Sequence, residues 1–439
     1  MRAAKQSIPE HSGTPRDRLM AAAEALFLRN GLVRTSVDAI VAAARTSKRD
    51  FYKHFRDRQG IFLEIAQQSL MVPNTQMDAI RQTIEQDVHK LAFSSGDIQR
   101  FLHMSARFIY DMHLDAQSLG LFRAALAASM LHPEVSGAVY RARSRTLVAS
   151  YLEDHREDHR LTFDDAHLAA IRFGHLATDG LRFMLGADPL SSEEREKLAW
   201  EVSGLFLDGH AAPRFRAGDE LSRVDLSGDP TPSDAKPRRI IEAFADTRLS
   251  PAVWDRMLDT AWAEFGAHGY DDTSLGVVAQ KAGVSRNALY RQYGSKENLF
   301  LASAGRVVDR VYGGFTVPQG QCGQVHEALI ELALQLLQRF LIPENLDLHR
   351  QLLIHAGQRP GMTSRIYGYL TDTVLKALSP VFKRLGDLVI KQEVAARAPW
   401  RFFVLASFGT RFIFVPPEHR EQRELATEAV YQFLYGCRR

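Results

Sequence analysis

The sequence contains one pattern twice, and this repeat is what most constrains the fold. Residues 256–300 repeat the pattern of residues 18–62 at a shift of 238 positions, without a gap. The matching residues are Arg18, Phe27, Gly31, Thr35, Ser36, Ile40, Ala44, Ser47, Tyr52, Phe55 and Phe62, against Arg256, Phe265, Gly269, Thr273, Ser274, Val278, Ala282, Ser285, Tyr290, Tyr293 and Phe300. Such a repeat predicts similar structural units within one chain.

A second set of matches extends the repeat toward the end of each half, at a shift of 227 positions. Arg123, Pro133, Tyr140, Leu198, Phe206, Leu207 and Gly209 correspond to Arg350, Pro360, Tyr367, Leu425, Phe433, Leu434 and Gly436. The shift is smaller because the second copy is shorter between the two blocks. Duplication of a whole unit explains both shifts, and 439 residues suffice for two units of about 200 residues each.

The second copy predicts three short helices. Apolar residues follow one helix face at Met257, Leu258, Ala261, Trp262 and Phe265. Gly269 then ends this helix, and Thr273 or Ser274 can cap the next one. Gly283 can adopt a left-handed turn, after which Ser285 can cap a third helix. Two short helices that meet at such a turn predict a helix-turn-helix.

This segment resembles the DNA-binding head of the tetracycline-repressor-like (TetR-type) family of bacterial regulators. The resemblance rests on Phe265, Gly269, Thr273, Ser274, Val278, Ala279, Ala282, Gly283, Val284, Ser285, Leu289, Tyr290, Tyr293, Lys296, Glu297, Leu299 and Phe300. So many matches in a fixed order make a specific signal, far stronger than a single short pattern. Because the first copy shares the pattern, the chain is expected to carry two such heads.

The first head departs from the family pattern at its turn. Helix 1 is expected from about Arg16 to Arg29, and residues 35–38 and 47–50 fit capping boxes for the next two helices. Arg45 stands where the second copy has Gly283, and a left-handed conformation costs a non-glycine residue roughly 1 kcal/mol. Arg58-Gln59 also replaces the family's Lys-Glu pair. The second head is therefore the more typical DNA-binding unit.

The third helix of each head is the predicted recognition helix. Arg and Lys can donate to guanine, Asn and Gln can pair with adenine, and tyrosine hydroxyls can reach phosphates. The resemblance implies phosphate contacts for the helix 3 tyrosines, Tyr52 and Tyr290, and for the residues that open helix 4, Arg58 and Lys296. The candidate DNA-binding residues are Thr35, Ser36, Ser47, Lys48, Arg49, Tyr52, Lys53, His54 and Arg58, and Thr273, Ser274, Ser285, Arg286, Asn287, Tyr290, Arg291, Gln292 and Lys296. The alternative is that these charges only solvate an exposed helix face.

The rest of the chain has helical patterns and no sustained alternation typical of strands. We predict an all-α protein divided as follows: 1–15, a disordered arm; 16–62, the first head; 63–210, the first C-terminal helical domain; 211–250, a linker; 251–300, the second head; 301–439, the second C-terminal helical domain. The resemblance implies that the C-terminal domains bind an effector and dimerise.

In the family, the last two helices of each subunit pack as a four-helix bundle. The corresponding pairs here are about 164–185 with 192–207, and about 399–415 with 420–435. Packing of one pair on the other within the chain would give a single-chain pseudo-dimer. Packing between chains would give a homodimer with four heads. A linker of roughly forty residues permits both arrangements.

Composition excludes several other classes. A formal charge of +3 does not by itself imply nucleic-acid binding, so DNA contact requires locally clustered charge. The two cysteines cannot form a disulfide framework, and no membrane span or signal core is evident, so a cytoplasmic protein is expected. His155 and His159 lack the order of a metalloprotease motif, and no phosphate loop, dinucleotide fingerprint or nucleophile elbow occurs. No enzyme, cofactor or metal is predicted.

The sequence and this resemblance thus predict a transcriptional regulator. The resemblance implies a repressor that is released by a small-molecule effector, which the sequence does not identify. Because the two recognition helices differ, the operator is expected to have dissimilar half-sites. In one alternative, one unit has lost DNA recognition and serves as a built-in partner for the other. In another, the chain is a ligand-free architectural DNA-binding protein.

Overall fold

The structure, a computed structural model, describes residues 13–32, 34–70, 96–114, 119–121, 123–124, 147–163, 165–212, 250–313, 325–407 and 417–437. Every regular element of these residues is helical, and an isolated antiparallel bridge joins Ala211 to Ile390. The predicted all-α class is therefore confirmed. The predicted arm lies mostly outside the described residues, as do Pro133 and nearly all of the predicted linker.

The first head consists of α1 (Pro15–Asn30), α2 (Val37–Ala43), α3 (Lys48–His54) and the beginning of α4 (Arg58–Leu70). Thr14 caps α1 in a capping box with Asp17, and Pro15 occupies the first turn, where its missing N–H costs nothing. Phe27 and Phe62 are fully buried and meet edge to face, with ring centroids 5.1 Å apart. This contact fixes α1 on α4.

The second head repeats this arrangement with α12 (Pro251–Asp272), α13 (Leu275–Ala282), α14 (Arg286–Tyr293) and α15 (Lys296–Tyr312). Gly269 leaves the helical conformation at φ 76°, so the predicted stop is present as a kink within α12. Phe265 and Phe300, the counterparts of Phe27 and Phe62, again meet edge to face at 4.9 Å. The duplicated residues therefore form the same core contact in both heads.

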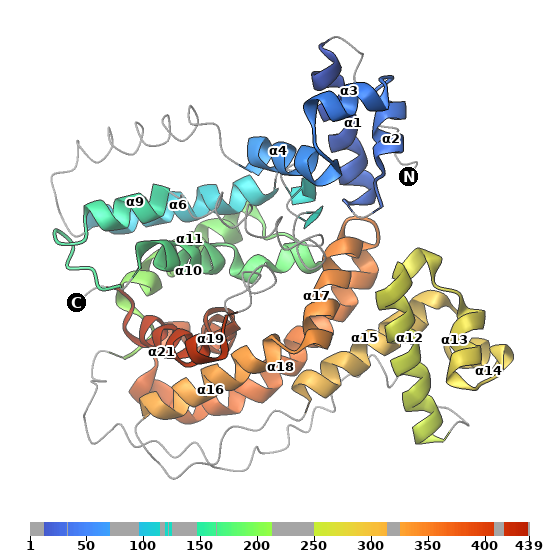
Figure 1. Cartoon of the computed structure of the whole chain (residues 1–439). Coiled ribbons are helices and arrows are strands. Elements are labelled where there is room, and N and C mark those ends of the chain that lie inside the picture. The colour runs from blue at the N-terminus through green and yellow to red at the C-terminus, as the bar shows by residue number, and fades with distance from the viewer. Residues whose placement is uncertain are drawn as a thin grey trace.

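The helices of a C-terminal helical domain come after each head. The first unit has α6 (Gly96–Leu114), α9 (Leu147–Asp154), α10 (Ala166–Ala177), the 3₁₀ helix η1 (Asp179–Leu185) and α11 (Ser192–Asp208). The second unit has α16 (Val325–Phe340), α17 (Pro343–Ala356), α18 (Pro360–Val389), η4 (Gln392–Arg397), α19 (Ala398–Ser407) and α21 (His419–Tyr435). Figure 1 shows the two heads at one side of the molecule and the last helices of both units gathered at the other.

The last two helices of each unit form one four-helix bundle within the chain. Helices α10 and α11 pack on each other and on α19 and α21, respectively. The backbone N–H of His210 donates to the carbonyl of Phe433 over 2.8 Å, and that of Cys437 donates to the carbonyl of Phe206 over 2.9 Å. Residues 206 and 210 correspond to 433 and 437 in the duplication. The bundle is thus closed by reciprocal bonds between corresponding residues.

The structure adds detail at the predicted divisions. Helices α4 and α15 run through the divisions placed after residues 62 and 300, so each head shares a continuous helix with the C-terminal helical domain that follows it. Ala211 and Ala212, expected to begin the linker, are buried and bond through their N–H groups to the second unit. Ser36 rather than Thr35 caps α2, because Thr35 is buried and its hydroxyl is used within the head.

Candidate nucleic-acid interface

Helix α3 of the first head has a buried side, which packs on the core, and an exposed basic side. Phe51 and Phe55 are buried beneath it, which orients the remaining residues outward. Lys48, Arg49, Lys53 and His54 are exposed, and 58% of Tyr52 is exposed. All five are candidates from the sequence, and the structure brings them together on one short helix.

Helix α14 of the second head has the same construction with different side chains. Leu289 and Tyr293 are buried and take the place of the anchoring residues. Arg286, Asn287, Arg291 and Tyr290 are exposed, the last by 40%, while Gln292 is half-buried. The guanidinium of Arg286 lies 5.6 Å from the ring centroid of Tyr290. This face combines two cations with two amides, whereas the α3 face carries cations and an imidazole.

The turn before each recognition helix has the same backbone geometry. Gly283 is left-handed at φ 68°, and Arg45 is left-handed at φ 49°, as predicted. In both heads the next N–H donates back to the preceding helix over 3.0 Å, from Thr46 to Val41 and from Val284 to Ala279. These bonds complete the usual left-handed helix end. The first head therefore keeps the turn, although it lacks the glycine that makes it free of strain.

Serines begin the short helices of both heads. Ser47 caps α3 in a capping box with Asp50, as predicted, and the Ser285 hydroxyl accepts from the N–H of Ala288 over 3.1 Å. Ser36 caps α2 in the same manner, whereas Ser274 stands at the N-cap of α13 without a capping hydrogen bond from its side chain. All four serines are exposed and remain candidates for phosphate contact.

Two candidate threonines lie inside the heads. Thr35 and Thr273 are 1% and 4% exposed, respectively. Their hydroxyls donate to the carbonyls of Gly31 and Gly269 over 2.8 and 2.6 Å, which secures the loop between the first two helices. Their role in the described fold is structural, so we leave them out of the proposed interface.

Arg58 and Lys296 occupy equivalent positions at the start of α4 and α15. Arg58 donates to the carbonyl of Thr35 over 3.3 Å, and Lys296 donates to the carbonyl of Asp271 over 2.8 Å. Each side chain is half-buried and ties the fourth helix to the loop after the first. A guanidinium carries five N–H donors and an ammonium three, so one bond to this loop does not use all of them, and both residues remain candidates for phosphate contact.

The electrostatics differ between the two faces. The Lys48 ammonium lies 2.6 Å from a carboxylate oxygen of Asp38, which raises the pKa of Lys48 through a hydrogen bond and charge attraction. Lys48 must therefore share its donors between Asp38 and any nucleic acid. Arg45 and Arg56 are exposed on either side of α3 and were not among the sequence candidates. Arg45 comes after α2 at the position of the family's glycine, and this departure was the available clue.

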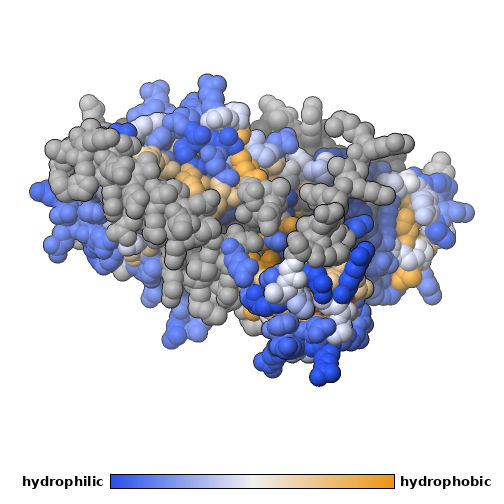
Figure 2. Space-filling model, turned by 90° about the horizontal axis from the view of Figure 1, so that it is seen from above, coloured by the Kyte–Doolittle hydropathy of each residue, from blue (hydrophilic) through white to orange (hydrophobic). Residues whose placement is uncertain are grey.

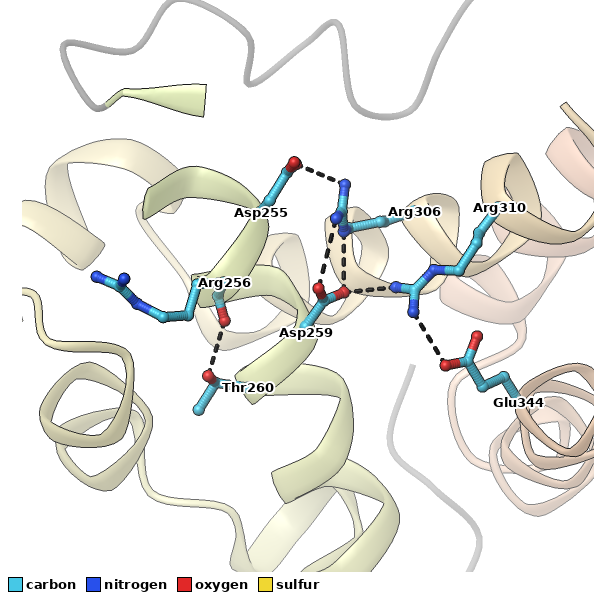
Figure 3. A network of polar contacts seen from close by, with 7 residues as sticks. All are labelled: Asp255, Arg256, Asp259, Thr260, Arg306, Arg310 and Glu344. Atoms are coloured by element: carbon cyan, nitrogen blue, oxygen red, sulfur yellow. Dashed lines mark hydrogen bonds and ion pairs between the residues drawn. The ribbon is translucent and has the colours of Figure 1, made fainter. Parts of the chain in front are cut away.

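The second head is fixed to the helices of its C-terminal domain by a network of ion pairs (Figure 3). Arg306 of α15 bonds Asp255 over 2.5 Å and Asp259 over 2.9 Å, both on α12. Arg310 bonds Asp259 over 2.5 Å and Glu344 of α17 over 2.9 Å. No pattern in the sequence indicates this network, because its members come from three helices.

The first head lacks the central pair of this network. The positions that correspond to Asp259 and Arg306 in the first copy hold Ala21 and Gln68. An ion pair between Arg16 and Glu64 joins α1 to α4 there instead. The two heads are therefore attached to their units by different side chains.

Other kinds of site find little support in the described residues. They contain no group of three or more histidine, cysteine, aspartate or glutamate side chains arranged to hold a metal ion. His155 and His159, which have the spacing of two ligands on one helix face, have ring centroids 6.0 Å apart. Among the helices described, none is both long and apolar enough to cross a membrane. Seen from above in Figure 2, the coloured surface is largely hydrophilic, with hydrophobic residues in small patches.

Comparison with known proteins identifies both heads. Residues 19–65 and 257–303 each match the bacterial regulatory proteins of the tetR family. Residues 101–211 match the C-terminal domain of AefR-like transcriptional repressors. Over 66 residues the chain is 39% identical to the HTH-type transcriptional repressor ComR of Escherichia coli (strain K12). That alignment covers 15% of this chain and 31% of ComR, so the chain spans about a third of this curated relative's length.

Solved structures of similar proteins each cover less than half of the chain. A TetR-family transcriptional regulator of Mesorhizobium loti has 24% identity and a TM-score of 0.36, over 42% of this chain and 95% of its own. A TetR family transcriptional regulator of Pseudomonas syringae pv. tomato has 22% identity and a TM-score of 0.33, over 42% and 96%.

The matches and the architecture agree on one assignment. Two segments match the same family description, and both fold as a helix-turn-helix followed by a fourth helix. A repressor C-terminal domain is matched after the first of them. The chain belongs to the TetR family of bacterial regulatory proteins and carries two of the family's heads in tandem.

Proposed function

We propose that this protein is a DNA-binding transcriptional repressor in which one chain recognises one operator with two unlike heads. The observation that carries the proposal is the pair of short helices, α3 and α14, at equivalent positions of the two heads. Each is anchored by two buried residues and exposes cations, a tyrosine and other polar groups. Such a helix can enter the major groove while its neighbours contact phosphates.

The two heads favour different bases. Arg49 and Lys53 of α3 can donate to guanine O6 and N7. On α14, Arg286 and Arg291 can do the same, and Asn287 adds an amide that can pair with adenine N6 and N7. An operator that satisfies both heads has two dissimilar half-sites. A palindrome would satisfy one head and leave the other with poorly matched bases.

A single chain supplies what the family obtains from two subunits. The four-helix bundle of α10, α11, α19 and α21 is complete within the chain. Ion pairs join the two units there, including Arg172 with Glu428 and Arg401 with Glu201, and in both pairs the arginine is buried and the glutamate is half-buried. A second chain would need a further surface of this kind, because the bundle helices are already occupied. This supports a pseudo-dimer bound to DNA as one chain.

We propose that a small-molecule effector controls the distance between the heads, as the family assignment suggests. The continuous helices α4 and α15 connect each head to its regulatory domain. The ion pairs from α12 to α17 add a second connection in the second unit. An effector releases the protein from DNA only if it binds the arrangement with the wrong head spacing more tightly.

The decisive experiment selects the tightest binding site from genomic fragments, maps it by nuclease footprinting, and determines the mass of the complex. We expect two unlike protected half-sites and one chain per site. A palindromic site that carries two chains would contradict the proposal. Weak binding with a steep salt dependence and little sequence preference would indicate an architectural protein instead.

The alternative with one working head is motivated by the strained turn at Arg45 and the Lys48–Asp38 ion pair. Replacement of Arg286 and Arg291 by alanine should reduce operator affinity under both hypotheses, by roughly 10-fold or more for each arginine that pairs with a base. Replacement of Lys48 and Arg49 by alanine should do so only if the first head binds DNA. The matched control replaces Lys376 and Arg420, two exposed cations of α18 and α21, and removes the same charge.

A further inference from the structure

Two pairs of duplicated residues lie beside their own counterparts. In the bundle, Gly209 corresponds to Gly436, and each packs against the backbone that precedes the other. Between the heads, Arg34 corresponds to Asp272, and a guanidinium nitrogen lies 3.7 Å from a carboxylate oxygen. Corresponding residues can touch only near the axis that relates the two copies. The axis therefore passes through the bundle and between the heads.

The contact between the heads is made by unlike charges. Arg34 bonds Asp271 over 3.1 Å as well as approaching Asp272. Its guanidinium also covers Gly269, where an added Cβ would lie 2.6 Å from the Nη2 nitrogen. Gly269 thus provides both the positive φ of the kink and the space for the arginine of the other head.

The turn between α17 and α18 also contacts both heads at this point. Arg359 bonds the second carboxylate oxygen of Asp271 over 2.5 Å and lies 4.4 Å from the ring centroid of Tyr270. Its neighbour Gln358 donates to the backbone carbonyl of Arg29 in the first head over 3.1 Å. In Figure 1 this turn lies at the upper end of α17, next to the first head. Both heads are held by one turn of the second unit.

The charges at this contact would be different if two equivalent heads met. If two chains associated through their first heads, Arg34 of one chain would face Arg34 of the other. If they associated through their second heads, Asp271 and Asp272 of one chain would face the same two aspartates of the other. Like charges at such a separation repel, whereas the observed arrangement alternates Arg34, Asp271 and Arg359. We infer that the head surface around Arg34 and Asp272 is built to pair the two unlike heads of one chain and to disfavour pairing of equivalent heads.

This inference deepens the proposed function, since it concerns which heads stand side by side on the operator. It is tested on the free protein, so its failure and a failure of DNA binding are separable. The variants are Arg34→Cys, Asp272→Cys and the double variant, in a background where Cys322 and Cys437 are replaced by alanine. Each is treated with a short bismaleimide reagent, and the products are sized and mapped by mass spectrometry.

We expect the double variant to form a link between residues 34 and 272 within one chain, so that the product has the mass of one chain plus one reagent molecule. Neither single variant should give a product of doubled mass. A doubled product from either single variant would mean that equivalent heads meet. A doubled product from the double variant would mean that the unlike heads come from different chains. Either doubled product overturns the inference, as does a double variant that forms no link while it remains helical by circular dichroism.

A charge-reversal series tests the electrostatic part. Arg34→Asp with Arg359→Asp, and Asp271→Arg with Asp272→Arg, should each lower the melting temperature by a few degrees, because each creates a group of like charges. The quadruple variant, in which every charge of the cluster is inverted, should recover most of the loss. Arg420→Asp, at an 81% exposed side chain on α21, is the control and should change little. If the loss in the quadruple variant equals the sum of the losses in the two double variants, the charges do not determine the pairing.

Discussion

Gly209 and Gly436 each pack against the backbone that precedes the other, at the point where the two units meet. Both have positive φ, 63° and 69°. A Cβ on Gly209 would overlap the carbonyl of Leu434, and a Cβ on Gly436 would overlap the carbonyl of Leu207. Residues 207 and 434 also correspond in the duplication. Each glycine therefore serves the same two purposes, a positive φ at the end of a helix and a close approach of two backbones.

This relationship predicts a large effect of a single methyl group. Gly209→Ala should destabilise the protein by more than about 2 kcal/mol, because an alanine at this positive φ and extended ψ costs roughly 1–3 kcal/mol and the Cβ overlap forces the two backbones apart. Urea unfolding measures the change. Gly174→Ala in α10 is the matched control, because no atom of the described residues lies within 4 Å of its added Cβ and a helical alanine is favoured. Equal stabilities for the two variants would contradict the packing of these backbones.

The turn of the first head predicts a stabilising substitution. Arg45 holds φ 49° where the second head has glycine, so Arg45→Gly should raise the stability of the first head by roughly 1 kcal/mol. Arg45→Ala removes the same charge but keeps the strain, and should not stabilise. Hydrogen exchange of α2 and α3 measures the local effect. If Arg45→Ala stabilised as much as Arg45→Gly, the gain would come from charge rather than backbone conformation.

The sequence predicted the local features of the fold well, because they depend on few neighbours. The left-handed turn at Arg45 and the Ser47–Asp50 capping box involve residues close in the chain, and both are present. The bundle helices expected over 192–207 and 420–435 also occur as α11 and α21, whereas the one expected over 164–185 is divided into α10 and η1, and the one expected over 399–415 is described only as far as Ser407. These features arise from helix periodicity and turn chemistry alone.

The features that the sequence did not predict involve residues far apart in the chain. Arg34 and Asp271 meet only because the bundle brings both units together. Thr35 and Thr273 were candidate DNA contacts by analogy, and their burial depends on how α1 and α12 pack. A linear pattern identifies which residues are polar, but the packing of helices decides which polar groups face water.

The ion-pair network of the second head predicts a salt-sensitive attachment. Arg306 and Arg310 hold the pKa of Asp259 below its usual range, against the opposing effect of burial. Arg306→Met keeps much of the side-chain volume and removes the charge, so α12 should exchange its amide hydrogens faster while α1 does not. High salt should weaken α12 protection in the natural protein and have less effect in the variant. Equal salt responses would show that the network does not hold the head.

Buried histidines predict that the protein loses stability in mild acid. Burial lowers the pKa of His349 to about 4 and that of His355 to about 4, and burial together with Arg401 lowers that of His210 to about 3. Unfolded histidine titrates near a pKa of about 6.5, so the unfolded chain binds these protons first as the pH falls. The contribution of these neutral histidines to the free energy of unfolding should therefore be fully present above about pH 6.5. Between about pH 6.5 and 4 each histidine should cost about 1.4 kcal/mol per pH unit.

His355 allows this prediction to be tested with one substitution. Among the described residues, neither of its ring nitrogens has a hydrogen-bond partner, and its ring meets Tyr270 and Phe300 edge to face at 5.7 and 5.8 Å. His355→Phe keeps these ring contacts and removes the titrating group. Urea unfolding at about pH 5 should show the variant more stable than the natural protein, with a much smaller difference at about pH 8. The slope of stability against pH gives the number of protons taken up on unfolding, and in the variant this number should be smaller by about one between about pH 6.5 and 4. An unchanged dependence would mean that His355 already binds a proton in the folded protein, which its position among Arg34 and Arg359 opposes.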